Sequence, residues 1–427
     1  MRRRSTHGTT QSDHSIKIQR IEPNMTADGG AALEAARKYE TEIVGFLREM
    51  IAIQSESLHE GERCKRIQQE YEALGFDEVF IDRLGNVIAR IGNGPLTILI
   101  DGHIDCVGVG DPDAWEFDPF EGKLEDGKVW GRGAVDELPV VACAAYGMKM
   151  LMERGVPDDV TIYLSATVME EDCDGYCLLH LIEKEGIRPD VVVIGEPTDM
   201  GVYRGQRGRV EAVITARGVS AHAAHPDQGV NALYKLAPIL QDIEALNDRL
   251  PSDDFLGKGT VVASHLECDS ASLNAVPAAA RLYIDRRLTA GEKPEEALAE
   301  IAALPSIGDC EVKMLEYDEI SWRGERANQD KFFPAWVLEE DHALVHGVAE
   351  AVESVTGEAP RISRWGFSTN GVATAGRHGI PSVGFAPGKE ELSHSTGEWV
   401  KIEDLVTSAA VYSMIPEILA ARMDELT

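Results

Sequence analysis

Five short segments place His, Asp and Glu side chains where they could hold metal ions. The segments are DGHID with His103 and Asp105, GRGAVDE with Asp136, VMEED with Glu170 and Glu171, IGEP with Glu196, and LSHS with His394. Zinc and similar divalent ions favour this mixture of imidazole and carboxylate ligands. A single His, Asp or Glu at the end of a strand more often caps the backbone or makes an ordinary hydrogen bond than binds a metal ion. Because five segments occur together, we expect a metal site that activates water for hydrolysis.

The first four segments follow or flank predicted elements of an α/β sheet. Helical periodicity covers residues 31–53 and 62–74, and the second helix ends at Gly75. The elements that follow are a hairpin of 79–81 and 87–91, a buried strand at 97–101, helix 138–154, strand 161–166, helix 176–185 and strand 191–194. This alternation predicts an α/β sheet, in which ligands collect beyond the carboxyl ends of the strands.

The pattern changes around Gly208. Strands are expected at 210–216, 260–266, 279–288 and 311–317, with helices at 231–246 and 294–303, which is a ferredoxin-like βαββαβ unit. Helix 343–355 and strand 381–385 then resume the first pattern. We therefore expect a discontinuous catalytic domain, residues 31–207 and 321–427, interrupted by a smaller domain at residues 208–320.

The ordered segments resemble the di-zinc aminoacylase and carboxypeptidase family, which includes acetylornithine deacetylase, succinyl-diaminopimelate desuccinylase, glutamate carboxypeptidase and peptidase T. The resemblance covers nearly the whole chain from about Ala31. Within that family the chain looks most like the hydrolases linked to selenium metabolism, through EEDCDGYC (170–177), EPTD (196–199), YRGQRGR (203–209) and FSTNG (367–371). The resemblance implies a di-zinc exopeptidase-like α/β catalytic domain, with the inserted domain acting as a lid and dimerisation domain.

The resemblance also implies a ligand set. By motif, His103 and Glu196 would hold one metal, Glu171 and His394 the other, and the carboxylate of Asp136 would bridge the two. A bridging carboxylate holds two metals about 3.5–4 Å apart, close enough to share one hydroxide. We expect two divalent ions, with zinc first and cobalt or manganese as alternatives, because ligand type does not fix the metal.

Two further acids complete the expected machinery. Asp105 would be the partner of His103, because His-x-Asp on an extended segment puts both side chains on the same side. Glu170, next to the ligand Glu171, would stay free to take the proton of the attacking water and hand it to the leaving nitrogen. No covalent acyl-enzyme is required by this scheme.

The inserted domain carries a second family-like motif, GVSAHAAHP at 218–226. The resemblance implies that His222 reaches across a dimer to stabilise the oxyanion, with His225 as the alternative. Asn274 and Arg287 resemble the family's contacts to a substrate carboxylate, which a guanidinium binds in a bidentate fork. An ion pair on an edge strand is the alternative for Arg287, and Arg207 is open in the same way.

The chain departs from the family pattern in two places. Ser368-Thr369-Asn370 stands where many relatives have Gly-Thr-Asp, which removes a negative charge that we expect near the second metal. The segment Ser-Thr-Gly-Glu after His394 also differs from the commoner sequence. Neither departure removes an expected metal ligand, but the first weakens any inference of the substrate from better-known relatives.

Several functions fit these parts. The leading hypothesis is a metal-dependent hydrolase that cleaves an amide bond of a peptide or N-acyl amino acid bearing a free carboxylate. Hydrolysis of an N-carbamoyl or ureido group is a close alternative. A non-catalytic metal-binding protein is disfavoured because Glu170 and every expected ligand are present.

Composition limits the partners and the compartment. The chain has 427 residues, 44% of them hydrophobic, and a formal net charge of -32, which argues against a nucleic-acid partner and leaves small molecules. Such acidity suits a salt-rich cytoplasm and an ordinary acidic enzyme equally well. The longest apolar runs are too short to span a membrane, and the basic, polar start lacks the apolar stretch of a secretory signal. We expect a cytoplasmic homodimer.

The start of the chain and its cysteines are expected to play no part in the site. Residues 1–30 are predicted to be a disordered tail, and Met25 is an alternative start. The seven cysteines are irregularly spaced and predict free thiols. Cys173 and Cys177 lack the second pair that a cysteine metal site would need.

Overall fold

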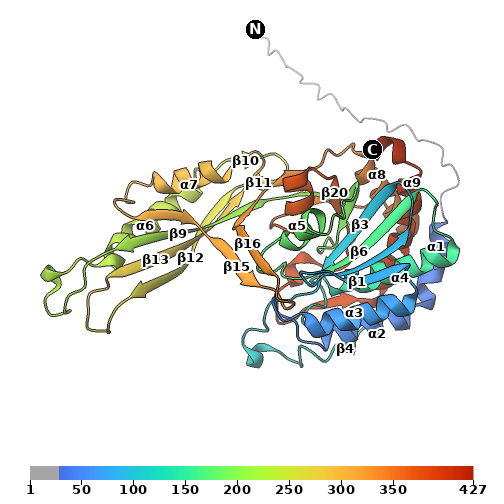
Figure 1. The fold of residues 1–427 in the computed structure, drawn as a ribbon, viewed down its shortest axis with the longest axis horizontal. Helices are drawn as coiled ribbons and strands as arrows, with labels where there is room; N and C mark the ends of the chain where they lie inside the picture. Colours follow the sequence, from blue (N-terminus) through green and yellow to red (C-terminus); the bar gives the residue numbers. More distant parts are fainter. Residues whose placement is uncertain (1–27, 427) are drawn as a thin grey trace, which may run out of the picture.

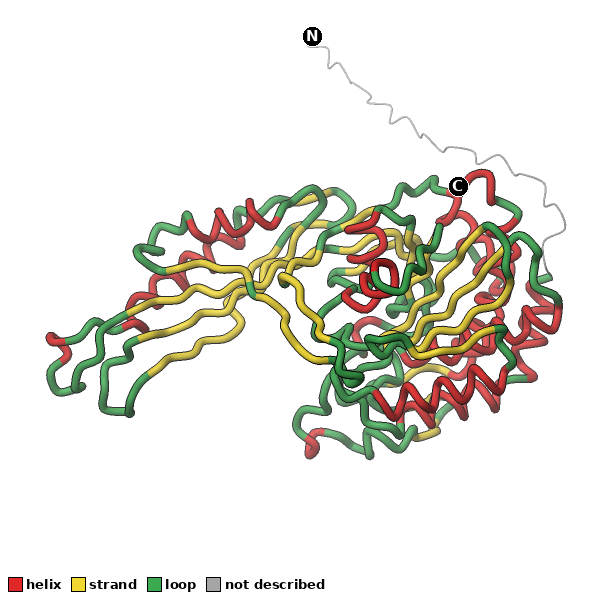
Figure 2. Tube along the Cα trace, in the orientation of Figure 1, coloured by secondary structure: helices red, strands yellow, loops and turns green. Residues whose placement is uncertain are grey.

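A computed structural model of the chain describes residues 28–426. A large α/β body carries an elongated sheet with two helices, which extends away from it (Figure 1). In the body, strands lie among helices, and strands also run from the elongated sheet toward the body (Figure 2). The fold is thus the mixed α/β arrangement with an inserted domain that the sequence predicts. The expected domain boundaries stay predictions.

The body is built on a nine-stranded sheet. Its order is β1-β2-β6-β3-β7-β20-β8-β18, and β19 pairs with β8. The strands are β1 (Glu78–Ile81), β2 (Val87–Gly92), β3 (Leu96–His103), β6 (Val160–Thr167), β7 (Val191–Ile194), β8 (Val202–Gln206), β18 (Trp336–Val337), β19 (Ile362–Trp365) and β20 (Ser382–Gly384). The neighbours β6, β3, β7 and β20 are parallel, so their carboxyl ends meet at one edge of the sheet.

Helices cover the faces of this sheet because its parallel strands are apolar on both sides. The helices of the body are α1 (Gly29–Lys38), α2 (Glu40–Ile51), α3 (Gly61–Leu74), α4 (Leu138–Arg154), α5 (Tyr176–Glu183), α8 (Ala343–Thr356), α9 (Ile402–Ala420) and α10 (Met423–Leu426). Helices α4 and α9 are buried on almost every side and pack together. They approach closely because α4 carries Gly147, where an added Cβ would lie 2.8 Å from the carbonyl oxygen of Ala409.

The inserted domain has a core of its own. Its sheet has the order β12-β13-β9-β14, with β9 (Gly208–Arg217), β12 (Thr260–Asp269), β13 (Ala279–Leu288) and β14 (Glu311–Met314), and β17 (Phe332–Phe333) pairs with β9. Strands β9 and β13 alternate buried and half-buried residues. The buried residues, such as Ile214 and Leu282, pack with α6 (Ala232–Asn247) and α7 (Pro294–Ala302).

Short strands complete the chain. They are β4 (Lys123–Glu125), β5 (Lys128–Trp130) and β21 (Trp399–Lys401) in one small sheet, the pair β10 (Ser252–Asp253) and β11 (Gly257–Lys258), and the hairpin β15 (Glu316–Ile320) and β16 (Arg326–Asp330). The hairpin reaches back to the body, where the indole of Trp322 donates to the carbonyl oxygen of Gly85 at 3.3 Å. A side chain at Gly85 would collide with that indole.

The structure differs from the predicted elements in a few places. The helix expected at 31–53 is two helices that meet at Tyr39, and the strand expected at 311–317 is divided between β14 and β15. Helix α1 begins at Gly29, where the side chain of Asp28 caps it, so residues 29 and 30 of the expected tail are helical. Residues 1–27 of that tail lie outside the described residues. Each of the seven cysteines is a free thiol.

Candidate metal centre

Three adjacent parallel strands bring most of the expected ligands together. His103 is the last residue of β3, Glu170 and Glu171 follow β6, and Glu196 follows β7. Asp136 comes from the loop before α4, and His394 comes from the loop after β20. All of these side chains except His103 line one pocket of about 340 Å³, and His103 lies buried beneath it.

The imidazole of His103 is held so that one ring nitrogen faces the acids. Its Nδ1 lies 2.9 Å from the backbone carbonyl oxygen of Asp105, which can only accept a hydrogen bond, so Nδ1 carries the proton. The other nitrogen, Nε2, lies 3.0 Å from Oδ1 of Asp136 and 3.9 Å from Oε1 of Glu196. Burial disfavours the charged imidazole, but Glu137, Asp136 and Glu170 outweigh it and raise the pKa of His103, so in the metal-free protein Nε2 also carries a proton and donates to Asp136. A metal ion would take the place of that proton on Nε2.

The carboxylate of Asp136 lies between two groups of candidate ligands. Its Oδ1 faces His103, while its Oδ2 lies 3.1 Å from Nε2 of His394. His394 also lies 3.2 Å from Oε2 of Glu171. The backbone of His394 has a φ of 60°, an uncommon conformation for a residue with a Cβ, and its side chain is about half exposed. Asp136 thus presents one oxygen to each histidine, as a bridging ligand must.

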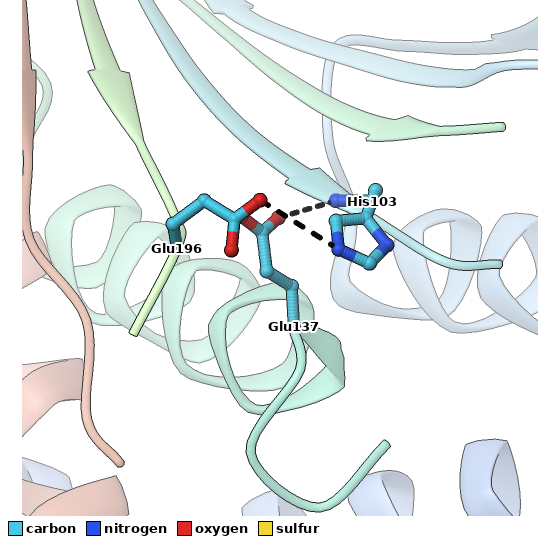
Figure 3. Close-up of side chains that lie close together, drawn as sticks. All are labelled: His103, Glu137 and Glu196. Atoms are coloured by element: carbon cyan, nitrogen blue, oxygen red, sulfur yellow. Dashed lines mark hydrogen bonds and ion pairs between the residues drawn. The ribbon is translucent and has the colours of Figure 1, made fainter. Parts of the chain in front are cut away.

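Glu137 is a further candidate ligand that the sequence reasoning missed. Figure 3 shows its carboxylate beside His103 and Glu196, and these three residues each offer a ligand atom within 4.8 Å of the others. A second such group consists of His103, Asp136 and Glu171. Glu137 also accepts the backbone N–H of His103 at 2.6 Å. Its position directly after Asp136 in GRGAVDE was the only signal in the sequence.

The buried carboxylates fit divalent cations. Burial raises the pKa of Glu137 to about 8, and burial together with the nearby Glu137 raises the pKa of Glu196. Burial opposes the charge of Asp136 too, but hydrogen bonds from His103 and His394 keep its pKa below the usual range. Like charges crowded in a low-dielectric site repel one another. Divalent ions would compensate these charges, so the donor set fits metal ions that favour oxygen and imidazole.

Glu170 has the surroundings expected of a group that exchanges protons. It lies in the pocket wall, 3.9 Å from Nε2 of His103, and is almost fully buried. Its Oε1 has no hydrogen-bond partner among the described residues. Burial, reinforced by the charge of Asp174, raises its pKa. A carboxylate with a free oxygen and a raised pKa is suited to accept a proton near neutral pH.

Asp105 differs from its expected arrangement. We expected its carboxylate to hold the imidazole of His103, but Oδ1 lies 3.6 Å from Nδ1, and the backbone carbonyl makes that hydrogen bond instead. The carboxylate accepts the backbone N–H groups of Glu170 and Glu171, each at 3.1 Å, and the hydroxyl of Ser57 at 2.7 Å. Its oxygens are occupied by the segment that carries the two glutamates.

The expected substrate contacts divide between two places. Arg287 lines the pocket, together with Arg209 from the neighbouring strand. Arg287 also makes a two-point ion pair with Asp285, at 2.8 and 3.0 Å, so the ion pair considered from the sequence and the pocket position occur together. Arg207 donates instead to the carbonyl oxygens of Gly366 and Lys258 and does not line the pocket.

His222 and Asn274 lie far from this pocket within one chain. Arg209 pairs with Arg287 at the pocket end of β9 and β13, and Arg217 pairs with Ala279 at the other end. Eight residues of strand span roughly 26 Å at about 3.3 Å per residue. His222 forms a bridge with Ala275 beyond that far end, where the backbone of Asn274 accepts the N–H of Ala223. His225 lies beside His222, with ring centroids 6.3 Å apart.

The first departure from the family pattern has a structural explanation. Asn370 is buried, and its amide donates to Oδ2 of Asp101 at 2.8 Å and to the hydroxyl of Thr167 at 3.1 Å. Its oxygen accepts the backbone N–H of Gly175 at 2.8 Å. An aspartate at this position would place a second buried carboxylate against Asp101. The amide of Asn370 therefore avoids repulsion between two buried carboxylates and donates a hydrogen bond to Asp101 instead.

Glu398, the last residue of the second departure, holds the backbone at Asp136. Its Oε1 accepts the backbone N–H groups of Val135 at 2.8 Å and Asp136 at 3.1 Å, and its Oε2 lies 2.6 Å from the guanidinium of Arg132. Both members of this ion pair are buried. The sequence reasoning missed this pair, because nothing in the motif shows that residues 132 and 398 meet.

Known proteins are similar to most of the chain. A sequence model of peptidase family M20/M25/M40 matches residues 99–417. The Escherichia coli K12 protein YgeY, described as uncharacterized, is 46% identical over 386 residues, which cover 90% of this chain and 96% of that protein. A succinyl-diaminopimelate desuccinylase of Dinoroseobacter shibae is 29% identical over 388 residues, which cover 88% of this chain and 98% of that enzyme.

A solved structure shares the fold. The Bacillus subtilis protein YXEP, described as a dinuclear metal binding peptidase, matches with a TM-score of 0.65 at 14% sequence identity, covering 90% of this chain and 99% of that chain.

No described helix is both long enough and apolar enough to cross a membrane.

Proposed function

The chain belongs to peptidase family M20/M25/M40 and is therefore a hydrolase of amide or peptide bonds; from this premise we propose that it hydrolyses an amide bond of a peptide or N-acyl amino acid with two divalent metal ions, for which zinc is our first assignment. The observation that carries the proposal is the position of Asp136, whose two oxygens face His103 and His394. A carboxylate that faces two imidazoles on opposite sides can bridge two ions.

The ligands divide between the two ions. His103 and Glu196 would hold one ion, Glu171 and His394 the other, and Asp136 would belong to both. The group of His103, Glu137 and Glu196 supports the first ion, to which Glu137 would add a carboxylate. The second ion is supported by His394, whose Nε2 lies 3.1 Å from Asp136 and 3.2 Å from Glu171. The description of YXEP as a dinuclear metal binding peptidase supports the number of ions.

Glu170 would carry the protons of the reaction. Divalent ions bound at this site would lower the pKa of water and polarise the carbonyl of the substrate. The free Oε1 of Glu170 accepts a proton from the attacking water and then donates it to the leaving nitrogen. Burial raises the pKa of Glu170, so its carboxyl group can keep the proton between the two transfers.

The substrate is proposed to carry a free carboxylate. Arg287 and Arg209 are the guanidinium groups of a pocket whose other charged side chains are acids or the histidine ligand. Arg209 is committed to Asp174 at 2.8 Å, and Arg287 binds Asp285 through Nε and Nη2, which leaves Nη1 available. An anionic group on the substrate would meet Arg287 there, opposite the metal ligands.

A substrate panel tests the proposal. Zinc-loaded protein should release a primary amine from at least one dipeptide or N-acyl amino acid, and chelation should abolish this activity. N-carbamoyl amino acids belong in the same panel, with ammonia measured alongside the amine. If only the N-carbamoyl amino acids are hydrolysed, with release of ammonia, the protein is an N-carbamoyl hydrolase and the assignment to peptide or N-acyl amide bonds is wrong. Absence of hydrolysis across the panel, with both ions bound, would contradict the proposed function.

The enzyme is further proposed to act as a homodimer through its inserted domain. Strand β12 is the outermost strand of its sheet, and its Val262 and Leu266 are exposed, as is Tyr234 on α6. A long edge strand beside exposed apolar side chains favours association with another chain. The distance of roughly 26 Å along β9 and β13 supports a role of His222 in the site of a second subunit rather than in its own.

Mixing two inactive variants tests this arrangement. His222→Ala and Glu170→Ala should each be inactive alone. After subunit exchange, a random mixture should recover about a quarter of wild-type activity, because half of the dimers contain one complete site. An enzyme that is monomeric at the assay concentration, or no recovery after proven exchange, would contradict the role of His222.

A further inference from the structure

The turn that presents Glu170 and Glu171 is held in an unusual way. Residues 168–171 follow β6, and each of their four backbone N–H groups donates to a side chain from a distant part of the chain. The acceptors are Asn86 for Val168 at 3.0 Å, Glu60 for Met169 at 3.1 Å, and Asp105 for Glu170 and Glu171 at 3.1 Å each. No strand or helix ladder supplies these four bonds.

The backbone at the centre of this turn is strained. Met169 has a φ of 64°, in the left-handed region that residues with a Cβ rarely adopt. Such a conformation persists only where the surroundings determine it, and it is common at active sites. The N–H of Met169 is the one that Glu60 accepts. The hydrogen bonds to the turn are therefore what keeps the strained conformation in place.

Glu60 is one of the side chains that hold this turn. It is fully buried just before α3, and its Oε1 accepts the N–H groups of both Leu58 and Met169. Its Oε2 has no hydrogen-bond partner among the described residues. No described cation forms an ion pair with it. A buried carboxyl group with an unpartnered oxygen is costly in either protonation state, which points to a function for the bonds that Glu60 makes.

Asn86 is oriented by a second set of contacts. Its amide donates to Oδ2 of Asp82 at 2.7 Å and to the backbone carbonyl of Cys177 at 3.4 Å. These contacts turn its oxygen toward the N–H of Val168. The side chain is fully buried, so it cannot exchange these partners for water. Asn86 therefore fixes the first residue of the turn, as Glu60 fixes the second.

We propose that Glu60 and Asn86 are positioning residues for hydrolysis, which hold the turn 168–171 so that Glu170 reaches the attacking water and Glu171 reaches its metal ion. The proposal rests on the proposed function for its catalytic part. Neither residue lines the pocket. Their effect follows from geometry, because a displacement of about 1 Å at a reacting group can lower a rate by about 100-fold.

Two substitutions of Glu60 separate positioning from general stability. Glu60→Gln keeps an oxygen that can accept the N–H of Met169, while Glu60→Met has a similar size and no acceptor. Asp242→Met is the matched control, because Asp242 accepts the backbone N–H of Ser306 at 2.7 Å in the inserted domain. The measurements are kcat, KM and the thermal midpoint at saturating metal, and the binding of Co²⁺ followed by its visible absorption.

Positioning predicts a specific pattern. Glu60→Met should lower kcat by at least about tenfold while KM stays within about threefold, because the substrate contacts are intact. Glu60→Gln should keep kcat within about threefold of the wild type, since the acceptor remains. Asp242→Met should lower the thermal midpoint and leave kcat unchanged. Binding of the second Co²⁺ ion should weaken in Glu60→Met alone, because Glu171 moves with the turn.

The remaining outcomes are equally decisive. A folded Glu60→Met with wild-type kcat, or a Glu60→Gln as impaired as Glu60→Met, would overturn the proposal. Should Glu60→Met fail to fold, Glu60→Asp replaces it, since the shorter side chain keeps the carboxyl group and loses the reach; wild-type kcat in that variant would overturn the proposal. If the wild type binds two ions yet hydrolyses nothing, the proposed function fails, and unchanged binding of the second Co²⁺ in Glu60→Met would then overturn positioning as well.

Discussion

The buried pair of Arg132 and Glu398 should respond unequally to the loss of either partner. Replacing Glu398 by Met leaves three buried donors without an acceptor: the Arg132 guanidinium and the N–H groups of Val135 and Asp136. Each unsatisfied buried donor costs about 1–3 kcal/mol. Glu398→Met should therefore destabilise the metal-free protein by roughly 3–9 kcal/mol, and it should also release the backbone that carries Asp136.

Replacing Arg132 by Met should cost less, because Glu398 can take up a proton. Burial raises the pKa of Glu398 from 4.5 to about 7 even beside Arg132. A carboxyl group with a raised pKa in the folded state is stabilised when protonated, so the stability it contributes falls as the pH rises through the folded pKa. Without Arg132 that pKa rises further. The cost of Arg132→Met should be small at pH 5.5 and increase above neutral pH toward about 3–5 kcal/mol.

Urea unfolding measures both effects. Metal-free wild type, Arg132→Met and Glu398→Met would be compared at pH 5.5 and 8 by tryptophan fluorescence, with the slope checked for each variant. We expect Glu398→Met to be the less stable variant at pH 5.5, and only Arg132→Met to lose stability steeply with pH relative to the wild type. An Arg132→Met penalty that is independent of pH, or that exceeds the Glu398→Met penalty at pH 5.5, would refute this reasoning.

Three further predictions concern the metal centre and the pocket. Asp136→Ala should lose metal and the part of the thermal stability that metal provides, since bound ions stabilise the folded state; unchanged metal content would exclude the bridging role. Hydrogen bonds to Asp136 and Glu171 raise the pKa of His394 to about 10 in the metal-free protein, so metal binding at pH 8 should release a proton and strengthen as the pH rises. Calorimetry in buffers of different ionisation enthalpy would detect the proton release. Metal binding that is independent of pH between 7 and 9 would exclude His394 as a ligand. Replacing the substrate carboxylate by an amide should lower kcat/KM far more for the wild type than for the Arg287→Ala variant. Equal losses of kcat/KM in the two enzymes would leave Arg287 with no role beyond its ion pair to Asp285.

Much of the fold could be predicted because its elements have strong local patterns. Helix α4 at 138–154 and strand β7 at 191–194 have the predicted bounds, and α3 ends at Gly75 in the left-handed conformation that glycine adopts readily. Helix α9 was not predicted. It is buried on nearly all sides and contains Pro416, so it shows neither the polar stripe nor the uninterrupted pattern that identifies a helix from sequence.

The site divides along the same line. The five expected metal ligands could be placed because each belongs to a recognisable segment at the end of an element. Glu137, Glu398, Glu60 and Asn86 could not be placed, because their contacts depend on where distant segments meet in three dimensions. Asp105 lies beside His103 as expected, with its carboxylate 3.6 Å from Nδ1, but its carbonyl makes the hydrogen bond, since sequence spacing does not distinguish a carboxylate from the carbonyl of the same residue. The resemblance to hydrolases linked to selenium metabolism stays a prediction.

Substitution of Glu170 tests the central claim most directly. The claim assigns Glu170 to proton transfer and assigns metal binding to its neighbours, so Glu170→Ala should retain both ions per chain while kcat falls by about 100-fold to 10,000-fold. Metal content by mass spectrometry and turnover on the substrate found in the panel would be measured on the same preparation. Full metal content with lost turnover is the predicted result. Loss of metal in Glu170→Ala, or wild-type turnover, would contradict the account.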